Sequence, residues 1–201
     1  MTEPLTKAEI VSSEQECLIL VDADDREIGQ LEKSACHDGN GVRHRAFSLF
    51  IFNAAGELLI QRRAAGKRLW PNYWSNSCCS HPRAGETMTE AVVRRVAQEL
   101  GLTTEPEFVY KFEYTAAFGT LGAEHELCSV FLGSALGEPV INTTEIGAWR
   151  WIAADDLDRE LDSNEAAFTP WFKLEWARLR SEHGHRLARL GVQSARQEPA
   201  R

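Results

Sequence analysis

The sequence lacks the features that mark several classes of protein. No apolar run approaches the roughly 20 residues of a membrane-spanning helix, and residues 1–16 have neither the basic nor the apolar segment of a signal peptide. The five cysteines are odd in number and include no Cys-x-x-Cys pair, which fits a reducing compartment better than a disulfide framework. We therefore expect a cytoplasmic protein without a membrane segment.

Positive charge is also scarce. The chain has 22 lysine and arginine residues against 30 aspartate and glutamate residues, a formal net charge of -8. It therefore lacks the basic face that general nucleic-acid binding requires. An acidic protein that binds an anion must gather its cations locally or borrow them from metal ions.

Length and hydrophobic pattern predict one α+β domain with a central sheet. The chain has 201 residues, of which 43% are hydrophobic; we expect a core over about residues 17–190 and flexible ends at 1–16 and 191–201. The strand candidates are Cys17 to Val21, Ala46 to Phe52, Glu57 to Gln61, Phe108 to Tyr114, Glu126 to Leu132 and Trp149 to Ile152. The second and third flank the turn Asn53-Ala54-Ala55-Gly56, which predicts a β-hairpin.

Two helices are predicted. Thr87 to Leu100 opens with the capping box formed by Thr87 and Glu90, and Gly101 follows as a C-terminal cap. Its apolar stripe recurs every four positions, at Met88, Val92, Val96 and Leu100. The second helix is expected from about Pro170 to Leu190.

The first helix resembles the Nudix box, the signature of enzymes that handle diphosphates. The matching residues are Gly85-Glu86, Arg94-Arg95, Glu99 and Gly101. A Nudix hydrolase has Arg-Glu and Glu-Glu pairs where this chain has Arg94-Arg95 and Gln98-Glu99, so two carboxylates that would gather hydrolytic metals are missing. Arg95 and Glu99 share a helix face and could equally form a surface ion pair worth about 0.3–0.5 kcal/mol.

Histidine and glutamate residues form a candidate metal site. His37 and His44 bracket a glycine-rich turn, and His81 lies in a polar loop downstream. Glu124 and Glu126 are two residues apart, so on a strand both point to one face. Together these side chains suit an octahedral site for Mn²⁺, Mg²⁺ or Zn²⁺, although each taken singly is more typical of a structural role. Structural roles are assigned to the remaining histidines, His125, His183 and His185.

A cysteine and a group of cations complete the candidate residues. Cys79 lies in a short polar loop before the Nudix-like helix, where a helix N-terminus, cations or a metal would lower the pKa of the thiol. The alternative, a small buried hydrophobic residue, is preferred for Cys17, Cys36, Cys78 and Cys128. The basic residues Arg62, Arg63, Lys67 and Arg68 form either a local anion site or a solvated basic loop.

Taken in order, these segments resemble the type I isopentenyl-diphosphate Δ-isomerase family, a branch of the Nudix fold. The segments are Leu31-Glu32-Lys33, His37, His44, Arg62-Arg63-Ala64, Lys67, Trp70-Pro71, Trp74-Ser75-Asn76-Ser77, Cys79-Ser80-His81-Pro82, Gly85-Glu86, Glu124-His125-Glu126 and Phe168-Thr169-Pro170-Trp171. The resemblance implies a Nudix-like fold with a mixed central sheet flanked by helices. It also implies an isomerase of isoprenoid biosynthesis that interconverts isopentenyl and dimethylallyl diphosphate, and it favours a monomer.

The resemblance also implies roles for individual residues. Cys79 and Glu126 would be the acid and base on opposite faces of the substrate. Tyr114 would lie beside the acid, and the indole of Trp171 would stabilise a carbocation. The diphosphate would be held by Lys33, Arg63, Lys67 and Arg95.

Two metal sites follow from the same resemblance. One would hold Mn²⁺, Zn²⁺ or Mg²⁺ on His37, His44, His81, Glu124 and Glu126. The other would hold a substrate-bridging Mg²⁺ on Glu99 and the backbone carbonyl of Cys79. Two hypotheses compete with the isomerase: a Nudix-type diphosphate hydrolase, and a non-enzymatic module in which the three histidines hold a structural metal.

Overall fold

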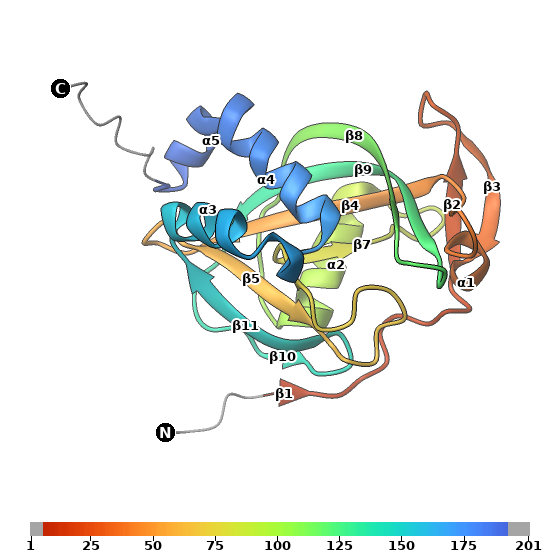
Figure 1. The fold of residues 1–201 in the computed structure, drawn as a ribbon, viewed down its shortest axis with the longest axis horizontal. Helices are drawn as coiled ribbons and strands as arrows, with labels where there is room; N and C mark the ends of the chain where they lie inside the picture. The colour runs from red at the N-terminus through yellow and green to blue at the C-terminus, as the bar shows by residue number, and fades with distance from the viewer. Residues whose placement is uncertain (1–5, 193–201) are drawn as a thin grey trace.

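The computed structural model describes residues 6–192, which form a nine-stranded mixed sheet, a two-stranded sheet and five α-helices (Figure 1). The strands are β1 (Thr6–Lys7), β2 (Cys17–Val21), β3 (Glu27–Glu32), β4 (His44–Phe52), β5 (Leu58–Arg63), β6 (Trp74–Ser75), β7 (Cys78–Ser80), β8 (Glu107–Ala117), β9 (Ala123–Ser134), β10 (Ile141–Asn142) and β11 (Ile146–Ile152). The helices are α1 (Lys33–Cys36), α2 (Met88–Leu100), α3 (Ala154–Ser163), α4 (Pro170–Glu182) and α5 (Gly184–Arg189), with a 3-10 turn, η1 (Glu165–Ala167). The predicted α+β class with a mixed central sheet is confirmed.

Strand β4 is the axis of the large sheet. It pairs in parallel with β9 along its whole length, from His44 opposite Glu126 to Phe52 opposite Ser134, and in antiparallel fashion with β7. Since helices cover both faces of the sheet here, β4 is an almost continuous apolar run instead of an alternating one.

The predicted hairpin of β4 and β5 is confirmed only at its turn and at the residue pair next to the turn. The Asn53 side chain accepts hydrogen bonds from the backbone N–H groups of Ala55 and Glu57, which fixes the turn. The two strands then pair only at Phe52 and Leu58. Beyond that pair β5 turns away to join β11 and β6, and β7 takes the place beside β4.

Helix α2 forms as its sequence predicts. The Thr87 hydroxyl accepts a hydrogen bond from the backbone N–H of Glu90, and the Glu90 carboxylate accepts one from the Thr87 N–H. Gly101 ends the helix in the left-handed conformation at φ 64°. The helix buries Val92 and Val96 against one face of the sheet, at about 1.5–3 kcal/mol for each side chain.

The prediction of one continuous helix from Pro170 to Leu190 is wrong. The structure has two helices, α4 and α5, that meet at His183 and Gly184. Gly184 favours a break at this point, because a glycine in the interior of a helix lowers its stability by about 1 kcal/mol relative to alanine. The His183 ring also stacks on Tyr110 of β8, with 5.1 Å between centroids, and this contact anchors the junction to the sheet.

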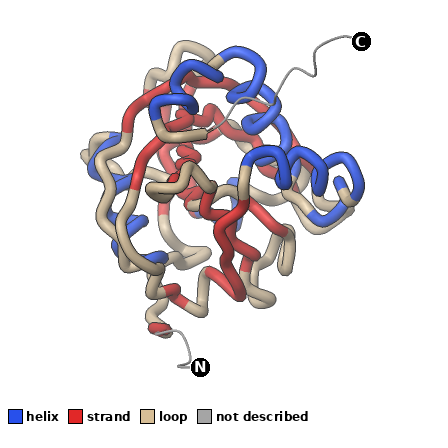
Figure 2. Tube along the Cα trace, turned by 90° about the vertical axis from the view of Figure 1, so that its left-hand side faces the viewer, coloured by secondary structure: helices blue, strands red, loops and turns tan. Residues whose placement is uncertain are grey.

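Helices lie on both faces of the sheet. Figure 2 shows the strands between α2 and the group formed by α3, α4 and α5, and each side has its own buried apolar cluster. Within residues 6–192, no helix combines the length and apolar character needed to cross a membrane.

The segment before β2 packs against the rest of the chain. Its strand β1 pairs in parallel with β10, Val11 is buried, and the Val11 carbonyl accepts a hydrogen bond from Arg95. Residues 1–5 and 193–201, which belong to the ends expected to be flexible, lie outside the described residues.

Candidate active site

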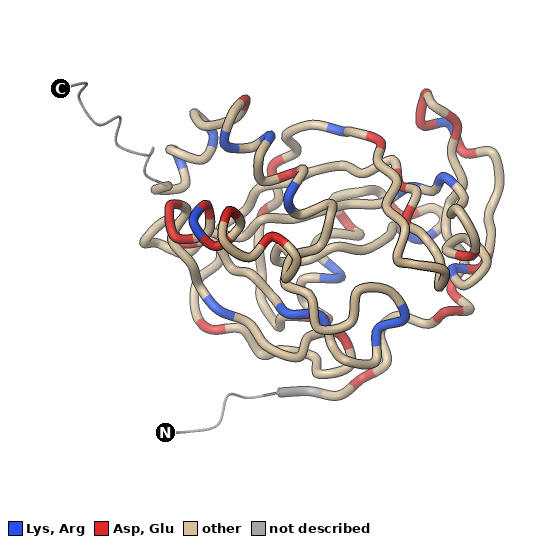
Figure 3. The backbone as a smooth tube through the Cα atoms, in the orientation of Figure 1, with Lys and Arg blue, Asp and Glu red and all other residues tan. Residues whose placement is uncertain are grey.

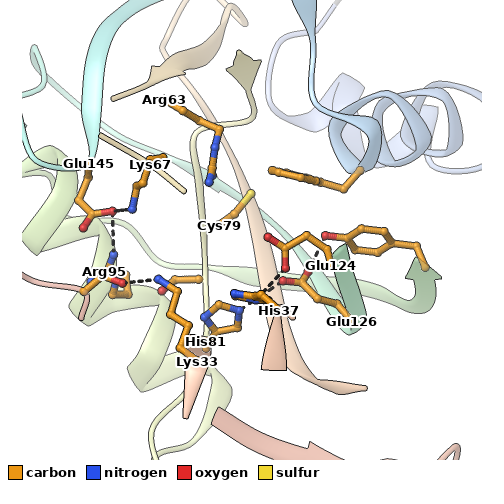
Figure 4. Close-up of a pocket in the computed structure, with 14 residues that line it drawn as sticks. Lys33, His37, Arg63, Lys67, Cys79, His81, Arg95, Glu124, Glu126 and Glu145 are labelled. Atoms are coloured by element: carbon orange, nitrogen blue, oxygen red, sulfur yellow. Dashed lines mark hydrogen bonds and ion pairs between the residues drawn. The ribbon is translucent and has the colours of Figure 1, made fainter. Parts of the chain in front are cut away.

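One pocket brings together residues from across the chain. Most residues predicted for the site line it (Figure 4). The two exceptions are His44, which contacts His81, and Glu99, which pairs with Arg95. The lining comes from elements far apart in sequence, because the ends of β7, β8 and β9 and the first turn of α4 meet beside the loop after β5.

The three candidate histidines form a tight cluster. Their ring centroids lie 4.9–5.9 Å apart, and the Nε2 atoms of His44 and His81 are separated by 3.2 Å. His44 is fully buried, and its Nδ1 lies 2.8 Å from the Val42 carbonyl. A proton on Nδ1 donates to that carbonyl and leaves the Nε2 lone pair facing the cluster, the arrangement typical of a metal-binding histidine.

The two glutamates close the cluster from β9. Glu124 Oε2 lies 2.9 Å from His37 Nε2, yet both atoms are buried without a well-directed hydrogen bond. Glu126 Oε1 lies 3.3 Å from His81 Nε2. Buried polar atoms without partners cost stability, and a cation bound between them would supply the missing partner. The donors form two groups that share His44, one of the three histidines and one of His44 with Glu124 and Glu126, each with its ligand atoms within 4.8 Å of one another. Nitrogen and carboxylate oxygen in this arrangement fit a divalent metal ion.

Electrostatics favour the ligand forms of His81, Glu124 and Glu126, whereas burial, which would lower the pKa of His44, is outweighed there by the hydrogen bond and charge of Glu126, and the pKa is raised. Burial lowers the pKa of His81 to about 4, so the imidazole is neutral near pH 7. Burial alone would raise the pKa of Glu126, but hydrogen bonds from His44 and His81 hold it well below its usual range. A neutral imidazole and a charged carboxylate are the forms that bind metal.

Glu126 also contacts the aromatic side chains of the pocket. The Tyr114 hydroxyl donates a 2.7 Å hydrogen bond to Glu126 Oε2, while Oε1 faces the histidines. The Trp171 ring lies beside Tyr114, with 6.2 Å between centroids. Its Nε1–H donates to Ser75 Oγ at 3.1 Å, so the indole is held at the pocket wall.

Cys79 approaches the pocket from β7. Its thiol donates a 2.7 Å hydrogen bond to Asn76 Oδ1, and the Ser48 hydroxyl lies 3.4 Å from the sulfur. Burial and the nearby carboxyl of Glu175 raise the pKa of the thiol well above its usual value. The sequence-based expectation of a lowered pKa is therefore wrong for the pocket without metal or substrate, where Cys79 is a neutral thiol.

Cations line the opposite side of the pocket. Lys67 forms an ion pair with Glu145, which also lies 3.6 Å from Arg95. Arg95 Nε donates to Glu99 at 2.9 Å, and both side chains are buried, so the interpretation of this pair as a surface ion pair is wrong. Lys33 Nζ donates to Ser12 Oγ at 2.8 Å.

The basic residues at the end of β5 and in the loop after it stand among scattered charges of both signs along the chain (Figure 3), and only some of them line the pocket. Arg63 lines it and donates hydrogen bonds to the carbonyls of Leu69 and Trp70. Arg68 instead pairs with Asp38 at the surface, and the exposed Arg62 is outside the pocket lining. Arg63 and Lys67 therefore lie where they could contact a bound anion, whereas Arg62 and Arg68 belong to the solvated part of the segment.

Sequence reasoning missed two buried glutamates beside these residues. Glu145 lies in the loop between β10 and β11 and neutralises Lys67 and Arg95; no local pattern marks it. Glu175 lies on α4 and is fully buried. Its position could have drawn attention, since it falls midway between Trp171 and Leu179 on the apolar stripe of the helix.

Comparison with known proteins agrees with this arrangement. A model of the NUDIX domain matches residues 42–172. The isopentenyl-diphosphate Delta-isomerase 1 of Photorhabdus laumondii is 44% identical over 174 residues, which cover 86% of this chain and 99% of that protein. The chain belongs to the isopentenyl-diphosphate Delta-isomerase family. The family's representative in Burkholderia multivorans is 42% identical over 158 residues, covering 79% of this chain and 89% of that protein.

A solved structure supports the fold of this isomerase-family chain. A protein from Deinococcus radiodurans superimposes with a TM-score of 0.64 at 26% identity, covering 79% of this chain and 96% of that one. The predicted family and its Nudix-like fold are thus confirmed. Within that fold, the residues Arg95 and Gln98 stand on α2 where a hydrolase's box has carboxylates.

Proposed function

We propose that the protein interconverts isopentenyl diphosphate and dimethylallyl diphosphate by a metal-dependent protonation and deprotonation. The relatives that carry this activity in their names match most of the chain. The observation that carries the proposal is the pairing of a Cys79 thiol with a Tyr114–Glu126 pair in one pocket, next to a wall of cations.

The chemistry requires two proton carriers. One of Cys79 and Glu126 donates a proton to the terminal alkene carbon, which leaves a tertiary carbocation. The other removes a proton from the carbon next to the C–O carbon, and its C–H electron pair becomes the new double bond. The proton count of the two side chains together is unchanged, and no covalent intermediate forms.

The aromatic wall suits the cationic intermediate. Trp171 lies in the pocket beside Tyr114, and its ring already faces one positive charge, since the Arg63 guanidinium lies 5.4 Å from the ring centroid. The indole packs edge-on against Trp70 at 5.2 Å, which keeps this side of the pocket apolar. Exclusion of water protects the carbocation from capture.

The cations would hold the diphosphate. Lys33, Arg63, Lys67 and Arg95 line one side of the pocket. In the absence of substrate, Glu145 balances part of their charge, and phosphate oxygens would replace these contacts. Glu99 and the backbone carbonyl of Cys79 would hold a Mg²⁺ ion, which would supply further positive charge to the diphosphate.

The His/Glu cluster fits a divalent cation, for which we propose Mn²⁺, with Zn²⁺ or Mg²⁺ as alternatives. The ligands would be His37, His44, His81, Glu124 and Glu126. When bound, the ion would supply positive charge that orients Glu126 and tunes its acidity.

Two variants test the assignment. Cys79→Ala and Glu126→Gln should each lower isomerisation by about 10²–10⁴-fold, the usual contribution of an acid–base group, while far-UV circular dichroism stays unchanged. Cys17→Ala is the matched control because Cys17 is an exposed cysteine on β2. Full activity of either site variant would refute the assignment.

The same assay separates the isomerase from a Nudix hydrolase, which the loop and helix of residues 85–101 favour. Release of phosphate or pyrophosphate from isopentenyl diphosphate would support hydrolysis. Arg95 and Gln98 count against it, since a hydrolase needs more carboxylates on α2 to gather its metals.

We further propose that the chain acts as a single-domain cytoplasmic monomer that binds no nucleic acid. All five cysteines are free thiols, which suits a reducing compartment. The net charge of -8 disfavours contact with nucleic acid.

A further inference from the structure

A buried carboxyl group lies behind the Cys79 thiol. Glu175, on α4, is fully buried, and Cys128 Sγ lies 3.5 Å from its Oε1. Its other oxygen, Oε2, is buried without a hydrogen-bond partner. Burying an unpartnered carboxyl destabilises a fold, so packing does not account for a glutamate at this position.

A chain of polar groups links Glu175 to Cys79. The Ser48 hydroxyl lies 3.5 Å from Cys128 Sγ and 3.4 Å from Cys79 Sγ, and it is near enough to the Glu175 carboxyl to lower the pKa of that group. Ser48 stands directly opposite Cys79 in the pairing of β4 with β7. Three strands and one helix therefore hold these four side chains in contact.

The direction of the Ser48 O–H bond determines whether the Cys79 sulfur receives a hydrogen bond. In the structure the Cys79 thiol donates a hydrogen bond to Asn76 Oδ1. This amide oxygen is only an acceptor, so it could not donate a hydrogen bond to a thiolate. When Cys79 gives up its proton, Ser48 is the neighbouring group able to donate a hydrogen bond to the sulfur. Such a donor favours the thiolate, and it is available only if the single Ser48 O–H is not already donating to another acceptor, such as an ionised Glu175 carboxylate.

We propose that Glu175 is a positioning residue that acts on Cys79 through Ser48. As a neutral carboxylic acid it donates to the Ser48 oxygen and so directs the Ser48 O–H towards the Cys79 sulfur. The inference rests on the proposed function, in which Cys79 exchanges a proton with the substrate, and it adds a residue of α4 to that step. Glu175 itself exchanges no proton with the substrate.

The surroundings of Glu175 favour its neutral form. Burial, together with the negative charge of Glu126 on β9, raises the pKa of Glu175 to about 8, although hydrogen bonds from Ser48 and Cys128 partly oppose the shift. The other titratable groups that face it are Cys79 on β7 and Tyr110 on β8, whose hydroxyl donates to the Glu175 backbone carbonyl. An ionised Glu175 would oppose thiolate formation, because its charge raises the pKa of Cys79.

Two substitutions at this position separate positioning from packing. Glu175→Gln keeps the shape and a neutral donor, so kcat near pH 7 should stay within about twofold of wild type. Glu175→Leu removes the donor; kcat should fall about tenfold, the scale of one hydrogen bond, with KM unchanged. The melting temperature of Glu175→Leu should equal or exceed that of wild type, because an unpartnered buried polar group is lost.

The dependence of kcat on pH gives a further test, because a purely structural role of Glu175 would leave that dependence unchanged. Wild-type kcat should decline above about pH 8, and Glu175→Gln should lack this decline. Glu182→Gln is the matched control, since Glu182 lies on the same helix but pairs with Arg178 at the surface. It should behave as wild type throughout.

Each outcome decides the proposal. Full kcat in Glu175→Leu, or an equal loss in Glu175→Gln and Glu175→Leu, would overturn it. Cys79→Ala, assayed in the same series, distinguishes a failure of the proposed function from a failure of this inference alone. An active Cys79→Ala removes the proposed role of the thiol and this inference with it. An inactive Cys79→Ala with a fully active Glu175→Leu rejects the inference alone.

Discussion

At the scale of single residues, two adjacent cysteines have opposite environments. Successive side chains of a strand point to opposite faces, so on β7 Cys78 enters the apolar cluster under α2 while Cys79 faces the pocket. The preference for a structural role at Cys78 and a chemical role at Cys79 agrees with this geometry. The doublet Cys78-Cys79 is therefore one buried residue and one candidate proton carrier.

Alkylation should distinguish the two thiols. A thiol-directed reagent such as iodoacetamide should inactivate the protein by modifying Cys79, which is less buried than Cys78. The reaction should be slow at neutral pH because the raised pKa of Cys79 leaves little thiolate, and isopentenyl diphosphate with Mg²⁺ should slow it further. Peptide mass spectrometry provides the measurement. Labelling of the exposed Cys17 serves as the internal control because it should proceed equally with and without substrate. Inactivation that substrate does not slow would remove Cys79 from the site.

The chemical types of the site residues could be predicted from sequence, but their electrostatics could not. The spacing Glu-x-Glu on a strand was enough to place Glu124 and Glu126 on one face. The pKa of Cys79 depends on burial under α4 and on Glu175, neither of which is encoded near Cys79. Glu145 was missed for the same reason, since its partners Lys67 and Arg95 meet it only in the folded chain.

Glu175 also predicts how stability depends on pH. Its pKa is raised from the usual 4.5 to about 8 in the folded protein. As pH rises, the unfolded chain therefore loses this proton at a lower pH than the folded protein does. Stability is then lost as pH rises from about 4.5 to about 8, at up to about 1.4 kcal/mol per pH unit. Urea unfolding at pH 5 and pH 8 should show this loss in wild type relative to Glu175→Gln. Equal losses in both proteins would contradict it.

At the scale of elements, those with local signals were predicted and those set by tertiary contacts were not. Helix α2 carries its own cap, stripe and terminating glycine, and it formed as predicted. The break between α4 and α5 depends on the stacking of His183 on Tyr110. The divergence of β5 from β4 depends on β7 and β11 as competing partners. Helix α3 was missed; its N-cap, Ala153, makes no side-chain capping hydrogen bond.

The cap of α2 gives a test of element stability separate from chemistry. Thr87→Ala removes the side chain that accepts from the Glu90 N–H and should destabilise the fold by about 1 kcal/mol. Isomerase activity below the melting transition should be unchanged, because Thr87 does not line the pocket. Denaturant unfolding measures the first effect and a steady-state assay the second. An unchanged midpoint would mean that the capping box contributes nothing to stability.

At the scale of the whole molecule, the sheet brings the proposed proton carriers and the cations proposed to hold the diphosphate to one place. The parallel pairing of β4 with β9 sets His44 opposite Glu126, and the ladder of β4 with β7 sets Cys79 beside them. Segment 8–16 closes another side through Ser12 and Val11. Its part in the pocket had no local signal in the sequence.

The same architecture predicts what metal removal does. The apolar clusters on both faces of the sheet do not depend on the His/Glu cluster, so a chelator should abolish isomerisation while the fold persists. Activity should return on addition of Mn²⁺ with Mg²⁺. Circular dichroism with and without chelator gives the structural readout. Unfolding by the chelator would instead favour a structural metal.

The most direct test of the central claim is isotope incorporation. The protein is incubated with isopentenyl diphosphate and Mg²⁺ in deuterated water, and the product is followed by NMR. A proton transfer from the enzyme predicts deuterium in a methyl group of dimethylallyl diphosphate. Dimethylallyl diphosphate without deuterium in its methyl groups, or release of phosphate in its place, would contradict the account.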